Sequence, residues 1–175
     1  MNNSYPEKSI LAYKKTVVSM ADVIADIKKS TENADIKRMA YVMFRNESGN
    51  GKSGINNNYC GFQADSGRWA PLYDNIIEGV VKKVENGTRK DRLFLAFYDV
   101  NGCLSMLFDR VKGRGLYIGG TTKKIWVNHL IKDVNDLSLA YQKEWVKGSI
   151  NAVPTPQEQS NFISMYNQAI KLFTV

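Results

Sequence analysis

The sequence has few residues that could hold a metal ion or form a disulfide framework. Its 175 residues include two cysteines and one histidine. Cys60 and Cys103 show no metal-ligand spacing, and we expect free, buried thiols, although a bridge between them stays open. His129 has no partner in view, which argues against a zinc site or a Ser-His-Asp triad. We therefore expect neither a metal nor a cofactor.

The sequence also lacks a long apolar run. No uninterrupted stretch approaches the length of a membrane span, and residues 1–9 are too polar for a secretory signal. We expect a protein made in the cytoplasm without a signal peptide. If its target lies outside the cell, phage lysis, a virion or an injected effector route must deliver it.

What is present is typical of a globular domain. The apolar fraction is 43% and the charged fraction 23%, and 175 residues suit one domain that can bury a proper core. The formal net charge is +7, which favours encounters with polyanions. Nucleic acid, an anionic membrane and bacterial wall polymer all qualify, so charge alone does not choose among them.

Apolar spacing predicts an α+β fold that is mostly helical with a small antiparallel hairpin. We expect a single domain over 1–175, with an amphipathic helix in 1–30, a helix, loop and β lobe in 33–130, and closing helices in 131–175. The apolar face of the first helix is expected to run from Ile10 to Ile27. Asn33 or Thr31 should cap the second helix, and Asn86-Gly87 indicates the hairpin turn. The expected strands are 76–84 and 93–100, and the later helices are 104–111, 134–147 and 157–173. The last helix is expected to follow Pro156, with an apolar face from Phe162 to Phe173.

Glu47 continues the apolar stripe of the second helix and is predicted to face inward on its last turn. The stripe consists of Ile36, Ala40, Met43 and Phe44. Burial among apolar groups penalises the charged form of a carboxyl group, and a carboxyl that keeps its proton can act as a general acid. The alternative is a surface glutamate on a frayed helix end.

The run from Phe44 to Trp69, FRNESGNGKSGINNNYCGFQADSGRW, resembles the active-site stretch of the lysozyme superfamily. Glu47-Ser48 matches the Glu-Ser at the end of a helix in animal lysozymes. Goose-type lysozymes, lytic transglycosylases and wall glucosaminidases have a comparable pattern. The second part of the match consists of Asn58-Tyr59, Gly61, Gln63 and 66–69. The resemblance implies a lysozyme-like fold that cleaves β-1,4 bonds of peptidoglycan, with Glu47 as general acid, and a phage lysozyme fits it.

The position that matches the second carboxylate of animal lysozymes is Asn58, and three routes remain. Asp65 could supply the carboxylate, although it also suits a turn before Ser66-Gly67. A hairpin carboxylate, Glu78 or Glu85, could serve. We favour the third route, in which the N-acetyl group of the substrate or a positioned water assists.

Several residues of this stretch are expected to bind sugar, because amide groups reach hydroxyls and aromatic rings pack on a pyranose. Tyr59 and Trp69 suit the core of the small lobe equally well, and Tyr117 suits a packed strand end. The expected substrate-binding residues are Ser48, Asn58, Tyr59, Gln63, Arg68 and Trp69, with Tyr117 facing the cleft from the far side.

Two other functions remain open. Asn58 in place of an acid is compatible with a catalytically inactive lysozyme-fold protein that binds cell wall. A basic nucleic-acid binder is the third hypothesis, because cations flank the hairpin turn; no obligatory nucleic acid is expected. The cations are Lys82, Lys83, Arg89, Lys90 and Arg92.

Overall fold

The computed structural model describes residues 8–64 and 69–175. The fold is α+β, as predicted, and the chain groups into two compact units. Of the described residues, the first unit contains 8–26, 44–64 and 69–106, and the second contains Ile27–Met43 and Leu107–Val175. Within the described ranges no helix is long and apolar enough to cross a membrane.

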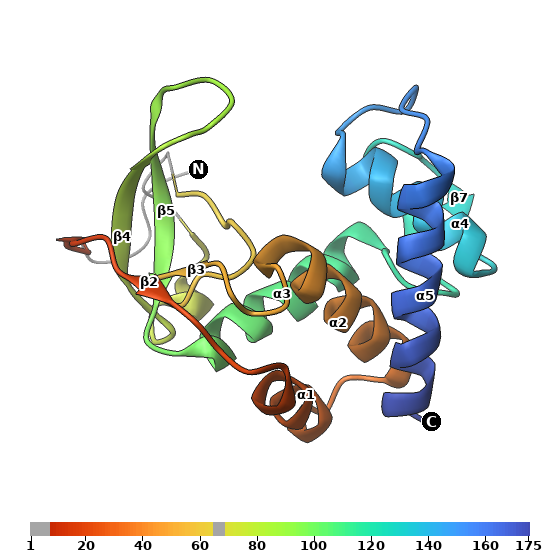
Figure 1. Ribbon diagram of the computed structural model, residues 1–175, viewed down its shortest axis with the longest axis horizontal. Coiled ribbons are helices and arrows are strands. Elements are labelled where there is room, and N and C mark those ends of the chain that lie inside the picture. The colour runs from red at the N-terminus through yellow and green to blue at the C-terminus, as the bar shows by residue number, and fades with distance from the viewer. Residues whose placement is uncertain (1–7, 65–68) are drawn as a thin grey trace. The chain divides into compact units, whose positions relative to one another are not determined.

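The first unit is built on a mixed three-stranded sheet with the order β1-β4-β5 (Figure 1). The two predicted strands pair antiparallel, and a very short strand joins β4 in parallel. A second ladder pairs β2 with β3. The strands are β1 (Ile10–Leu11), β2 (Lys15–Thr16), β3 (Gly54–Ile55), β4 (Ile77–Val84) and β5 (Asp91–Phe97), and a 3₁₀ turn η1 spans Pro71–Tyr73.

The first helix, α1 (Met20–Lys29), is shorter than predicted. The expectation of an amphipathic helix from Ile10 onward is wrong, because Ile10 pairs with Val80 in the sheet. The Ser19 hydroxyl accepts the N–H of Asp22 at 3.1 Å, which is the bond of a helix N-cap. The β-branched residues before Ser19 lie outside the helix.

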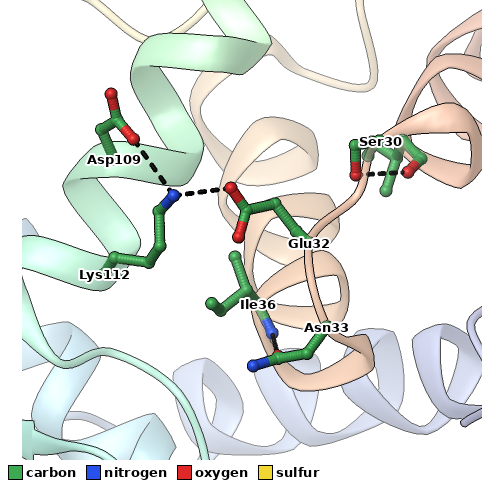
Figure 2. Close-up of polar contacts among 7 residues, drawn as sticks. Ser30, Glu32, Asn33, Ile36, Asp109 and Lys112 are labelled. Atoms are coloured by element: carbon green, nitrogen blue, oxygen red, sulfur yellow. Dashed lines mark hydrogen bonds and ion pairs between the residues drawn. The ribbon is translucent and has the colours of Figure 1, made fainter.

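The second helix, α2 (Ala34–Ser48), begins where the sequence indicated. The side chain of Asn33 accepts the N–H of Ile36 at 3.0 Å (Figure 2). Nearby, Lys112 of α3 (Val100–Arg114) bonds Glu32 at 2.6 Å, so the segment before α2 is tied to α3 within the second unit (Figure 2).

The remaining helices of the second unit follow the predicted order, whereas the short β6–β7 ladder was not predicted. Thr155 caps the last helix in a full capping box. The predicted helix over 134–147 exists, but its C-terminal part is a π-helical turn that contains the buried Glu144. The elements are β6 (Thr121–Thr122), β7 (His129–Leu130), α4 (Val134–Tyr141), the π-helical turn η2 (Gln142–Val146) and α5 (Pro156–Leu172).

Candidate functional site

The C-terminal turn of α2 is fixed by Ser48, whose side chain is fully buried. Its hydroxyl donates to the carbonyl of Phe44 at 2.5 Å and accepts the N–H of Gly51 at 2.8 Å. Gly51 has a φ of +83°, and a Cβ there would lie 2.2 Å from the carbonyl oxygen of Val18. Ser48 therefore stabilises the turn after the helix, and its hydroxyl is committed to the protein rather than to a ligand.

Glu47 is exposed, so the prediction that its side chain is buried by the apolar stripe is wrong. Met43 and Phe44 are both buried, and the buried stripe of α2 continues from Phe44 to Ser48, four residues later, whereas Glu47, four residues after Met43, is exposed. The carboxylate nevertheless lies near one buried group, because its charge contributes to raising the pKa of Cys60. Glu47 thus stands at the protein surface, within electrostatic reach of Cys60.

Asn58 is buried, with 5% of its surface exposed, and all its hydrogen-bonding capacity is used within the first unit. Its Nδ2 donates to the carbonyls of Phe62 and Leu95, both at 2.9 Å. Its Oδ1 accepts the N–H groups of Phe62 at 3.1 Å and Cys60 at 3.3 Å. A side-chain amide has two donor hydrogens and two acceptor lone pairs. Asn58 therefore holds the backbone together as a structural clamp. Its side chain has no hydrogen-bonding group left for substrate, so the expectation that it binds substrate is not supported.

The two asparagines before Asn58 act in the same way. Asn56 bonds the N–H of Lys14 and the carbonyl of Ala12, and Asn57 donates to the carbonyls of Phe97 and Tyr98. Asn56 and Asn57 both have positive φ, a conformation that asparagine tolerates better than most residues. The sequence reasoning missed this role, since its only signal was three consecutive asparagines in a loop.

Tyr59 belongs to the core, which was the alternative to sugar binding. It is 2% exposed, and its ring lies 5.3 Å from that of Phe44, centroid to centroid. Burial raises the pKa of Tyr59, and a hydrogen bond with Thr16 opposes that rise. Its N–H points to the sulfur of Cys103 at 3.4 Å.

The other aromatic candidate of this stretch, Trp69, is also a core residue. It is 6% exposed, and its Nε1 donates to Asp74 at 2.8 Å. Gln63 is exposed and forms an isolated bridge with Phe94 of β5. Of the expected sugar-binding residues in the first unit, Gln63 is the one whose side chain the structure describes as open to solvent.

Three predicted residues are not part of the described first unit. Asp65 and Arg68 lie outside the described residues. Tyr117 belongs to the second unit, where it is half-buried and its carbonyl accepts the N–H of Gly120 at 2.9 Å. Of the hairpin carboxylates, Glu78 is exposed on β4, and Glu85 accepts hydrogen bonds from Thr88 and Arg92 in the turn.

The two cysteines are free and buried, as expected. A hydrogen bond with Cys103, together with burial, raises the pKa of Cys60 well above its usual range. The described residues contain no group of three histidine, cysteine or acidic side chains that could hold a metal ion. The candidate site is thus a surface carboxylate, Glu47, that precedes the buried Ser48 in the chain and whose charge acts on the buried Cys60.

No protein-family model, curated protein or solved structure matches this chain.

Proposed function

We propose that the protein cleaves glycan strands of peptidoglycan at a β-1,4 bond, with Glu47 as the general acid of a lysozyme-like domain. One observation carries the proposal: an exposed carboxylate stands on the last turn of α2, and the next residue, Ser48, is buried and fixes that turn through two hydrogen bonds. A catalytic acid must be open to its substrate and held in place. The order of helix, polar loop and β hairpin supports the same domain type.

Because Glu47 is exposed, the substrate itself must exclude water from this acid. An acid that protonates a leaving oxygen near neutral pH must favour its protonated form, and exclusion of water favours that form. In the free protein the Glu47 side chain is open to water. A glycan strand bound over it would exclude that water, so binding and activation of the acid would occur together.

The commitment of Asn58 supports the route without a second carboxylate at that position. Its amide holds the backbone of 60–62 against β5, so the asparagine at position 58 has a structural role. The N-acetyl group of the substrate or a positioned water then assists departure of the leaving group. Glu78, which is exposed on β4, stays the alternative among the described residues of the hairpin.

The test is loss of turbidity of purified cell wall by the wild type and by Glu47→Gln. General acids contribute roughly 10²- to 10⁴-fold to rate, so we expect Glu47→Gln to lose at least about 100-fold. Asn46→Asp is the matched control, because it exchanges the same two groups at the neighbouring exposed position and should keep activity. Glu78→Gln tests the hairpin carboxylate separately, and an inactive variant would identify it as the second group.

Mass spectrometry of the released muropeptides defines the reaction. The reducing-end sugar identifies the bond, and an anhydro product identifies a transglycosylase. If the wild type binds wall and releases no muropeptide, the protein is a wall-binding module of the same type. If Glu47→Gln clears wall as fast as the wild type, Glu47 is not the acid.

A further inference from the structure

The turn between β4 and β5 holds an arginine in a backbone conformation that favours glycine or asparagine. Arg89 has a φ of +56°, while Gly87, two residues earlier, is not among the positive-φ glycines. The turn is closed by two backbone bonds of 2.9 Å, from Arg89 N–H to the Glu85 carbonyl and from Glu85 N–H to the Lys90 carbonyl. A strained position occupied by a long cationic side chain indicates that the side chain has a use there.

The hairpin carries an excess of positive charge. Between Lys82 and Arg92 the sequence has five basic and two acidic residues, which is three of the seven net positive charges of the chain. The two acids are engaged with strand residues, because Asp91 bonds Lys82 at 2.7 Å and Glu85 bonds Arg92 at 3.3 Å. Arg89 and Lys90 are exposed and have no ion-pair partner within 8–64 and 69–175.

Beside this turn the surface is hollowed by about 580 Å³. Its lining includes two apolar side chains, Ile10 and Leu93, and Ile10 is 66% exposed. The turn projects from the ends of the two strands (Figure 1), and three of the residues that line the hollow are cations. The other lining residues are Lys82, Lys90, Asp91 and Arg92.

We propose that the hairpin turn and this hollow form a second binding site, for the phosphodiester groups of an anionic glycopolymer in the cell wall. Arginine binds phosphate through paired donors, and lysine binds it as a point charge. The choice of wall polymer rests on the proposed function. Single-stranded nucleic acid is disfavoured, because such sites stack bases on aromatic rings and no aromatic residue is among those that line the hollow. The site would hold the enzyme on wall while Glu47 acts elsewhere on its surface.

The experiment measures binding of the full chain to purified wall, and to the same wall after acid removal of its phosphodiester polymer. Arg89→Gly with Lys90→Gln removes two charges at the turn. Lys123→Gln with Lys124→Gln is the matched control, because it removes two charges from exposed residues of the second unit. We expect the turn variant to bind intact wall at least about tenfold more weakly and with a shallower salt dependence. The control variant should bind intact wall as tightly as the wild type. On stripped wall the turn variant and the wild type should bind equally.

Arg89→Gly alone separates recognition from a structural role. Glycine relieves the left-handed position, so the melting temperature should stay the same or rise while binding weakens. A melting temperature that falls in step with binding overturns the proposal, as does equal binding to intact and stripped wall. Tighter, turn-dependent binding to DNA than to wall also overturns it.

Failure here is distinguishable from failure of the proposed function. Glu47→Gln should keep full binding in this assay. Normal binding by the turn variant would refute this site, even if Glu47→Gln were inactive toward wall. Turn-dependent binding without any cleavage by the wild type would support the site and refute the activity.

Discussion

Asn58→Asp tests the assignment of Asn58 as a structural clamp. The substitution replaces the amide nitrogen, which donates to the carbonyls of Phe62 and Leu95, with an oxygen that faces both of them. Two lost hydrogen bonds cost about 1–3 kcal/mol, and a buried, uncompensated carboxyl adds a further penalty. We therefore expect a loss of about 3–5 kcal/mol at pH 7, against the total stability of about 5–15 kcal/mol that is usual for a domain.

The pH dependence of this loss has a definite sign. Burial against two carbonyl oxygens should raise the pKa of the introduced carboxyl above its unfolded value of about 3.9. Between the two pKa values the folded state keeps a proton that the unfolded state has released. The stability of the variant relative to the wild type should therefore fall as pH rises above about 4, by at most about 1.4 kcal/mol per pH unit. Above the folded-state pKa the difference should level off.

Urea unfolding at pH 4, 5.5 and 7 measures the effect. In a thermal scan at pH 7 the loss corresponds to a decrease of about 6–20 °C in melting temperature. Asn86→Asp is the matched control, because Asn86 lies exposed in the hairpin turn and the chemical change is the same. Equal midpoints for Asn58→Asp and the wild type at pH 7, or a variant that gains relative stability as pH rises, would refute the reasoning.

Two further predictions concern buried titratable groups. Burial, and then the charge of Asp35, raise the pKa of Tyr166 to about 12, whereas an unfolded tyrosine ionises at about 10. Folding stability should therefore fall between those pH values, and less steeply for Tyr166→Phe; equal slopes in denaturant titrations would contradict this. Cys60 and Cys103 are buried, so neither thiol should react with Ellman's reagent until guanidinium unfolds the chain. A thiol that reacts in the native protein as fast as free glutathione would be inconsistent with the structure.

Local signals predicted the parts of the fold whose causes are local. Asn33 and the apolar stripe located α2, and Pro156 with the spacing from Phe162 to Phe173 located α5. The hairpin followed from two apolar runs around Asn86-Gly87. Each of these depends on interactions within a few residues of sequence, which a periodicity can reveal.

Interactions between distant residues account for what the sequence did not predict. Ile10 fits a helical stripe, but it pairs with Val80, seventy residues away, and that partner is not visible in the spacing. The partners of the three loop asparagines lie mostly about 40 residues away. In such a stretch asparagine indicates only a loop. Its role as a clamp depends on strands that are distant in sequence, so it becomes visible only in the folded structure.

Glu47 and Asn58 both favour a mechanism in which the substrate contributes to catalysis. The protein does not bury Glu47, and it uses position 58 to hold its own backbone rather than to supply a second carboxylate. A glycosidase built this way relies on its substrate twice, first to exclude water from the acid and then to assist at the reacting carbon. Because both contributions need sugars seated against the Glu47 surface, shortening the glycan should reduce turnover as well as affinity.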